Sequence, residues 1–234
     1  MKKLIECVPN FSEGRDMDVI NRIVAAIGSV DGVSVLNVDP GAATNRTVVT
    51  LKEKPKAVTE AAFRGVAKAQ ELIDMRRHTG EHPRIGATDV LPLVPVSGVT
   101  MEEAAGLARG LAERVGNELG IPVYCYENAA YEEKRCNLAS CRAGEYEGLE
   151  KKLADPSWRP DYGPSEYNES VARSGASVIG ARDFLLAVNF NLNTTSTRRA
   201  NAIAFDVREK GRPKREGGSP VGKKILDAEG NVVM

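Results

Sequence analysis

The chain has 234 residues, of which 42% are hydrophobic and 27% charged, an ordinary composition for a soluble globular protein with one or two domains and a sizeable core. Its 32 basic and 32 acidic residues give a net charge of zero, so no global field favours nucleic acid, and we find neither an apolar stretch long enough to span a membrane nor a signal peptide. The four cysteines contain no C-x-x-C pair, which favours reduced thiols and a cytoplasmic location.

The first part of the chain alternates strand and helix patterns. Apolar residues at Val19, Ile20, Ile23, Val24 and Ile27 have the spacing of an amphipathic helix. A valine-rich alternating segment ends at Asp39 and predicts a strand, and a later helix begins at a proline, whose missing N–H costs nothing in the first turn. The expected elements are a strand at 2–9, a helix at 17–30, strands at 32–39 and 47–53 around a loop at 40–46, and a helix at 55–75.

The second part continues the alternation. Two prolines in residues 89–96 are expected to shorten that strand or push it to a sheet edge. Thr100 and Glu103 have the spacing of a capping box, and Gly120 is a typical helix end. The expected elements are a loop at 78–86, a strand at 89–96, a helix at 100–120, a strand at 121–127, a helix at 141–154, a strand at 182–192 and a helix at 196–211.

This order predicts the fold class. The first six elements read β-α-β-β-α-β, the order of a ferredoxin-like split βαβ unit, and an α-β pair and a later β-α pair follow. We therefore predict an α/β (α+β) protein with a ferredoxin-like mixed sheet and helices packed on one face. The other face is left for a ligand or partner.

The stretch "HTGEHPRIG" at residues 78–86 contains the only two histidines of the chain, His78 and His82. A His-x-x-Glu-His zinc site needs both on one helical face. Gly80 lies between them, and Pro83 disfavours the helical conformation for His82, so the stretch reads as a structured loop. A loop histidine either acts as a general base or hydrogen-bonds a carbonyl, and the loop alone leaves both open.

Four longer segments carry a resemblance: "ECVPNFSEGR" at 6–15, "DPGAATNRTV" at 39–48, "GEHPRIGATDVLPLVPVSGVT" at 80–100 and "GARDFLLAVNFNL" at 180–192. They resemble the glutamate formimidoyltransferase family, in order and from residue 1 to about residue 211. The resemblance implies transfer of a formimino group from N-formimino-L-glutamate to tetrahydrofolate, giving 5-formiminotetrahydrofolate and L-glutamate, in histidine degradation and one-carbon metabolism. Tetrahydrofolate would be a substrate, and no metal is expected.

The resemblance also implies site residues. His82 of "GEHPR" is the expected general base and acid, because one imidazole can accept the proton that N5 of tetrahydrofolate loses and donate it to the leaving nitrogen. The expected substrate contacts are Asp39, Asn10, Asn45, Glu81 and Arg84. The expected folate contacts are Gly180, Ala181, Arg182, Asp183, Phe184, Leu185, Leu186, Ala187, Val188 and Asn189. Ordinary alternatives stay open: turn roles for Asp39, Asn10 and Asn45, and a core strand for the last segment.

The resemblance further implies a division of the chain. Residues 1–180 would form the N-terminal subdomain, 181–211 either its last strand and helix or the start of a second subdomain, and 212–234 a linker or the truncated start of the second. Because folate lies between two subdomains in this family, we expect a homodimer or a partner chain that supplies the missing half. The alternative functions are a non-catalytic folate-binding or assembly subunit and, less favoured, a zinc hydrolase using His78 and His82.

Overall fold

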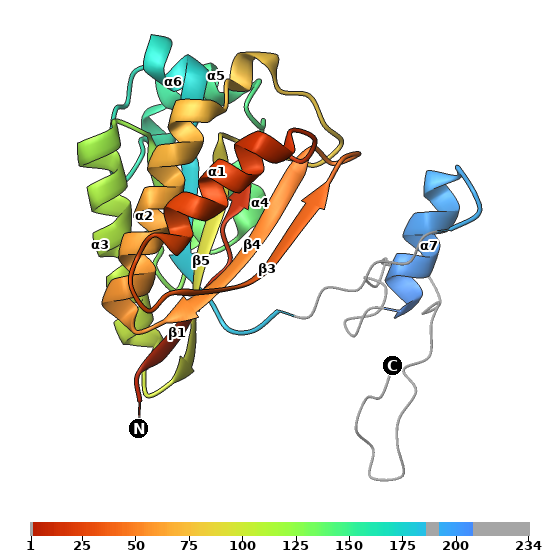
Figure 1. Ribbon diagram of the computed structural model, residues 1–234. Helices are drawn as coiled ribbons and strands as arrows, with labels where there is room; N and C mark the ends of the chain where they lie inside the picture. Colours follow the sequence, from red (N-terminus) through yellow and green to blue (C-terminus); the bar gives the residue numbers. More distant parts are fainter. Residues whose placement is uncertain (1, 186–191, 208–234) are drawn as a thin grey trace. The chain divides into compact units, whose positions relative to one another are not determined.

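The computed structural model describes residues 2–185 and 192–207, which belong to two compact units, Met1–Phe184 and Leu185–Met234. The first unit contains a seven-stranded sheet (Figure 1). The strands are β1 (Leu4–Cys7), β2 (Asn10–Phe11), β3 (Ser34–Gly41), β4 (Arg46–Glu53), β5 (Thr88–Ser97), β6 (Val123–Glu127) and β7 (Ser177–Ala181). The α-helices are α1 (Met17–Gly28), α2 (Pro55–Leu72), α3 (Met101–Leu119), α4 (Leu138–Arg142), α5 (Leu149–Ala154) and α6 (Glu169–Ser174), and α7 (Thr197–Val207) lies in the second unit. Short 3₁₀ helices are η1 (Met75–Arg77), η2 (Glu133–Arg135) and η3 (Pro156–Trp158).

The sheet joins an antiparallel half to a parallel half. The short strands β1 and β2 both pair antiparallel with β4 on one side and with β5 on the other, and β3 pairs with β4. β5 pairs in parallel with β7, which pairs in parallel with β6. The strand order from β3 to β5 is consistent with a ferredoxin-like unit, and β7 and β6 extend it. The predicted α/β class with a mixed sheet is confirmed.

Helices α1, α2 and α3 cover one face of the sheet (Figure 1), and their apolar residues form the main core with alternate residues of the strands. The expectation of helices on one face holds for β3, β4 and β1, whose second face carries partly exposed residues such as Val48 and Thr50. We call this second face the open face. Over β6 and β7 the second face of the sheet is covered, because Tyr124 and Tyr126 form a second core there with α4 and α5. Parallel strands are normally buried on both faces in this way.

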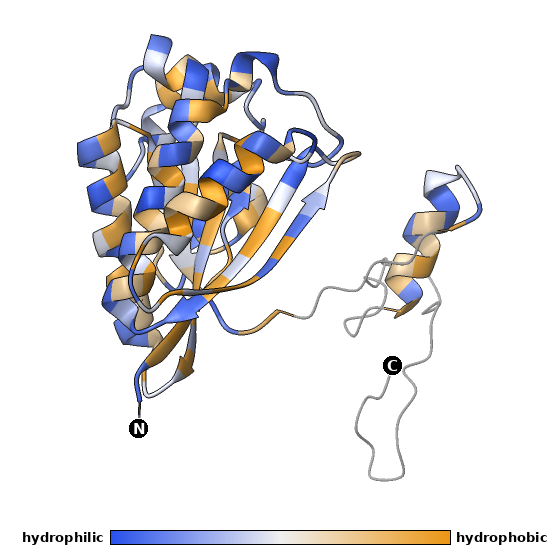
Figure 2. Cartoon of the chain, viewed as in Figure 1, coloured by the Kyte–Doolittle hydropathy of each residue, from blue (hydrophilic) through white to orange (hydrophobic). Residues whose placement is uncertain are grey.

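The longer helices are amphipathic, and Figure 2 shows hydrophobic and hydrophilic residues interleaved along them. Helix α3 begins with the predicted capping box, in which Thr100 and Glu103 each bond the other's backbone N–H, and it ends at Gly120 with a φ of 64°. Among the described residues, no helix has the length and apolarity needed to cross a membrane. The four cysteines are free, and Cys136 is the exposed one.

Strand β5 contradicts the expectation that its prolines shorten it or push it to an edge. It has ten residues and lies between β1/β2 and β7. Pro92 faces the break between β1 and β2, where its carbonyl accepts from Val8 N at 3.2 Å. Pro95 faces the other side, beyond the end of β7, which stops opposite Leu93. Because each missing N–H points at a gap in the neighbouring strand, no ladder hydrogen bond is lost.

Three other boundaries differ from the predictions. Strand β3 continues past Asp39 to Gly41, which pairs with Arg46 of β4. The single helix expected at 141–154 is two short helices, α4 and α5, because Gly144 and Glu145 have positive φ angles of 85° and 53°. The strand expected at 182–192 is absent from residues 182–185, since β7 ends at Ala181, and residues 186–191 lie outside the described residues.

The second unit contributes α7, which confirms a helix within the predicted range 196–211. Residues 208–234 lie outside the described residues. The expected division into 1–180, 181–211 and 212–234 stays a prediction.

Candidate active site

The loop that carries both histidines lies between η1 and β5, and residues 78–87 contain no helix, as predicted. The loop packs closely against the turn between β3 and β4. Gly80 makes this possible, because a Cβ there would lie 2.4 Å from the carbonyl oxygen of Thr44. Asn45 adopts a left-handed φ of 47°, which asparagine tolerates better than most residues. The loop and the turn are therefore held as one body.

Asn45 ties this body together. Its Nδ2 donates to Thr79 O at 2.8 Å, and its Oδ1 accepts from Gly14 N at 3.0 Å. Its own carbonyl accepts from His78 Nε2 at 2.8 Å. With its side chain engaged by backbone groups on two segments, Asn45 fits the turn role that the sequence left open.

His82 has a defined tautomer. Its Nδ1 lies 2.6 Å from Pro83 O, and its Nε2 lies 2.7 Å from NH1 of Arg46. A carbonyl oxygen only accepts and a guanidinium only donates, so Nδ1 carries the proton and the Nε2 lone pair accepts from Arg46. The imidazole is therefore neutral, with its basic nitrogen directed at an arginine.

The charge around His82 reinforces this state. Burial first, and then the guanidinium groups of Arg46 and Arg142, lower the pKa of His82 to about 4, against a smaller opposing effect of the Pro83 hydrogen bond. At neutral pH the ring is a base without a proton on Nε2.

The sheet register brings other predicted residues to the same face as Arg46. Asp39 and Asn10 both pair with Val48, and paired residues point to the same face of a sheet. Arg46, two residues before Val48, shares that face. The Asn10 Oδ1 accepts from NH1 of Arg46 at 3.0 Å, and Asp39 acts on Arg46 through its charge. Asn10, Asp39 and His82 thus converge on Arg46, which the sequence analysis did not single out.

A buried ion pair supports the second arginine. Asp89 of β5 is fully buried and accepts from Nε of Arg142 at 3.1 Å, with a second, shorter bond to NH2. It also accepts from Ile85 N at 3.1 Å. Burial raises the pKa of Asp89, and Arg142 opposes that effect. The pair fixes Arg142 close enough to lower the pKa of His82.

His78 and Arg84 form a separate group on the other side of the loop. Nε of Arg84 donates to His78 Nδ1 at 3.1 Å, so His78 carries its proton on Nε2, the opposite tautomer to His82. Arg84 is otherwise bound by Glu145 and Glu147, at 3.2 and 2.6 Å. These groups line a cavity of about 510 Å³. Arg84 is therefore engaged with His78 rather than with His82.

Glu81 is exposed, and its backbone N–H lies 3.4 Å from Ala43 O. Both ring nitrogens of each histidine have protein partners. In the part of the chain that the structure describes, no three His, Cys, Asp or Glu side chains are arranged to hold a metal. The zinc-hydrolase alternative also lacks the helix that it requires.

The predicted folate segment begins at Gly180, on the same face of the sheet as Asn10 and Arg46. Gly180 pairs with Tyr126 so closely that a Cβ would lie 2.3 Å from Tyr126 O. Burial raises the pKa of Glu6, and the charge of Arg182, two residues after Gly180, opposes that effect. Ala181 is buried in the main core. Asp183, Phe184 and Leu185 are exposed. Leu186, Ala187, Val188 and Asn189 lie outside the described residues.

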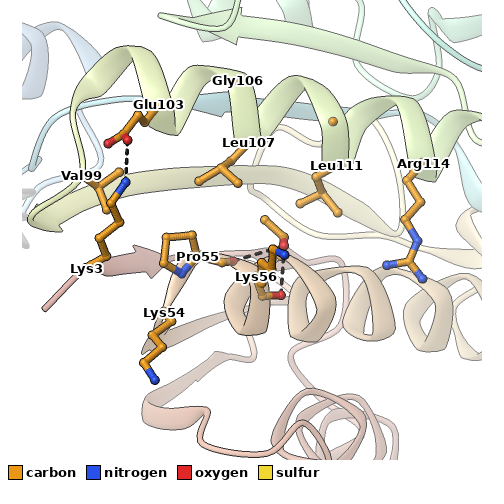
Figure 3. A pocket seen from close by; sticks show the side chains of 12 residues that line it. Lys3, Lys54, Pro55, Lys56, Val99, Glu103, Gly106, Leu107, Leu111 and Arg114 are labelled. Atoms are coloured by element: carbon orange, nitrogen blue, oxygen red, sulfur yellow. Dashed lines mark hydrogen bonds and ion pairs between the residues drawn. The ribbon is translucent and has the colours of Figure 1, made fainter.

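A cavity of about 770 Å³ lies elsewhere, between α2 and α3 (Figure 3). Its lining includes Pro55, Leu107 and Leu111 together with the basic residues Lys3, Lys54 and Arg114. None of the candidate site residues lines it. This cavity is therefore separate from the candidate active site, which is the group of residues around His82.

The chain matches a known family over residues 4–182, described as "Formiminotransferase domain, N-terminal subdomain". Formimidoyltransferase-cyclodeaminase of Sus scrofa is 50% identical over 219 residues, 93% of this chain and 40% of that protein. Glutamate formimidoyltransferase of Thermoplasma acidophilum is 49% identical over 88% of this chain and 68% of that protein, and the one of Streptococcus pyogenes is 43% identical over 90% and 70%. The chain thus spans two fifths of the bifunctional relative.

Proposed function

Because the chain belongs to the formiminotransferase family through its N-terminal subdomain, we propose that it carries the acid–base half of a formimidoyltransferase. The reaction moves the formimino group of N-formimino-L-glutamate to tetrahydrofolate and releases L-glutamate. The proposal is supported by relatives named glutamate formimidoyltransferase and by the geometry at His82.

The reaction needs one proton to move twice. N5 of tetrahydrofolate attacks the formimino carbon and forms the N5–C bond, and its proton passes to Nε2 of His82. The tetrahedral adduct then breaks the bond between that carbon and the glutamate nitrogen, which takes the proton back from Nε2. His82 ends as it began, so the two proton transfers balance and nothing is oxidised or reduced.

The observation that carries the proposal is the neutral His82 ring with its proton held on Nδ1. Pro83 O accepts that proton at 2.6 Å, which leaves the basic lone pair on Nε2, where it accepts from Arg46 in this structure. Holding the other ring nitrogen by a backbone carbonyl is the usual way in which a histidine's tautomer is fixed. A ring held in this orientation serves both proton transfers without turning.

The groups around His82 suit the amino-acid substrate. Arg46 and Arg142 supply positive charge for carboxylates, and a guanidinium can bind a carboxylate through two parallel hydrogen bonds. Asp39, on the same sheet face, supplies a carboxylate for the basic amidine, with Asn10 beside it. Tetrahydrofolate would lie along the open face toward Gly180 and Arg182, where the predicted folate segment begins.

The complete site is proposed to need a second half. The chain covers 68% and 70% of two relatives named as glutamate formimidoyltransferases, so a further segment would close the open face. The partner is a second subdomain, in a chain that dimerises as the resemblance suggests. No metal takes part in this scheme, in which His82 moves the proton while the formimino group passes from the glutamate nitrogen to N5.

The test is a transfer assay on this chain combined with a separately produced second subdomain. Tetrahydrofolate and N-formimino-L-glutamate should give L-glutamate and 5-formiminotetrahydrofolate in equal amounts. Omitting either substrate should abolish both products. A folded assembly that binds both substrates and forms neither product would refute the proposal and favour a non-catalytic folate-binding subunit.

A further inference from the structure

The lone pair that the proposed reaction uses is not free in this structure. NH1 of Arg46 lies 2.7 Å from Nε2 of His82 and donates into that lone pair. A nitrogen that already accepts a hydrogen bond from a cation is a poor proton acceptor, because protonating it would set two positive charges against each other. His82 must therefore lose its contact with Arg46 before it can act as a base.

The guanidinium of Arg46 lacks part of its hydrogen bonding. NH1 serves both His82 and the Asn10 Oδ1, which lies 3.0 Å away. Its Nε is buried and has no hydrogen-bond partner among the described residues. Buried polar groups are normally bonded, so an unbonded guanidinium N–H beside a candidate base points to a missing acceptor. Burial first, and then Arg142, lower the pKa of Arg46, which also indicates an uncompensated charge.

An anion is the acceptor that suits a positively charged guanidinium. The charged groups facing Arg46 and His82 come from three elements besides β4: Arg142 from α4, Asp89 from β5 and Asp39 from β3. Asp89 is already bound by Arg142, and the other acid of this set, Asp39, is exposed. A carboxylate would match the planar fork of Arg46 and would supply the acceptor that its Nε lacks.

We propose that Arg46 is a substrate-operated gate on His82. A carboxylate of the amino-acid substrate takes the Arg46 guanidinium, the Arg46–His82 hydrogen bond breaks, and Nε2 of His82 becomes free to accept the N5 proton. This inference rests on the proposed function and adds an order of events to it: the base is released only when the amino-acid substrate is in place. When product glutamate leaves, Arg46 returns to Nε2.

The gate has a measurable consequence for His82. In the free chain the pKa of His82 is low, at about 4, and Arg46 is one of its causes. A bound carboxylate removes the contact with Arg46 and adds a negative charge within a few ångströms, which typically raises a neighbouring group's pKa by about 1–3 pH units. L-glutamate, the proposed product, carries the carboxylates and is a stable probe.

The experiment is an NMR titration of the His82 ring nitrogens in the 234-residue chain, with and without L-glutamate. Glutamate should move the His82 titration midpoint upward by about 1–3 pH units, and L-norleucine, which lacks the side-chain carboxylate, should move it less. Arg46→Gln should raise the midpoint of the free chain and abolish the response to glutamate. Arg22→Gln, on an exposed arginine paired with Glu71, should leave both unchanged.

The outcomes separate the gate from the reaction. A parental midpoint that stays fixed at every glutamate concentration overturns the gate, and so does an Arg46→Gln variant that responds as the parent does. The parental titration stands without the variant if that variant fails to fold. Because the readout needs no folate, an assembly that fails to transfer the formimino group while glutamate still shifts His82 refutes the reaction and leaves the gate standing.

Discussion

Two histidines four residues apart hold their protons on opposite nitrogens. His78 donates from Nε2 to Asn45 O and accepts from Arg84 on Nδ1, whereas His82 donates from Nδ1 to Pro83 O and accepts from Arg46 on Nε2. His78 thereby fixes the backbone of the residue next to Arg46, while His82 presents its basic nitrogen beside the open face. His78 thus has a positioning contact, whereas we propose an acid–base role for His82.

Both histidines should make the fold sensitive to acid. Burial is the main cause that lowers the pKa of both histidines, and the pKa of His82 falls to about 4. A histidine in the unfolded chain has a pKa of about 6.5. Between these values the unfolded chain binds more protons than the folded chain, so the free energy of unfolding must fall as pH drops from about 6.5 toward 4. We predict that His82→Gln loses less stability than the parent over this range, measured by urea unfolding.

The control for this prediction is Arg22→Gln, which removes an exposed arginine far from the histidine loop in sequence and should lose as much stability as the parent. Equal acid sensitivity of the parent and His82→Gln would show that His82 is not held neutral by the fold.

The sequence pointed to part of this site. His82, Asn10 and Asp39 lie in the motifs that carried the resemblance, and the sheet register brings the last two to one face. Arg46 lies in one of those motifs and was overlooked, because it was assigned to a loop rather than to the first position of β4. Arg142 could not be found in this way, since its place depends on the packing of a short helix against buried Asp89.

At the scale of elements, local signals predicted helix ends well and strand positions less well. Capping at Thr100 and the left-handed Gly120 are decided within a few residues, so the sequence reveals them. The tolerance of β5 for Pro92 and Pro95 depends on gaps in neighbouring strands, and these gaps are properties of the assembled sheet. The break in the helix expected at 141–154 lies at Gly144, a residue type that commonly ends helices, and the sequence prediction passed over it.

The capping box of α3 gives a prediction at this scale. Thr100→Ala removes the side-chain acceptor of the Glu103 N–H and should lower the free energy of unfolding by about 1 kcal/mol. Thr100→Ser keeps a hydroxyl in place and should stay close to the parent. Urea unfolding of both variants measures the difference. Equal losses in the two would mean that the threonine methyl group, rather than the cap, stabilises the helix start.

For the molecule as a whole, the open face explains why the chain should work poorly by itself. Sites that hold drug-sized ligands cover about 70–90% of the ligand's surface, and one sheet face offers a single wall. His82 would then act in a site open to water, where oriented charges are weaker and the reacting atoms are loosely held.

We therefore predict that the 234-residue chain alone binds tetrahydrofolate weakly and transfers the formimino group slowly. Adding a separately produced second subdomain should raise both. The measurements are folate binding by calorimetry and glutamate release at increasing concentrations of the second subdomain. Full activity of the monomeric chain alone would contradict this prediction and would mean that it closes its own site.

The most direct test of the account is the turnover of His82→Gln in the assembly of both subdomains, with His78→Gln as the matched variant from the same loop. Removing the acid–base group should lower the transfer rate by about 10²–10⁴-fold while tetrahydrofolate still binds, and His78→Gln should have a milder effect. A His82→Gln assembly that turns over at close to the parental rate would contradict the assignment of His82 as the group that moves the proton.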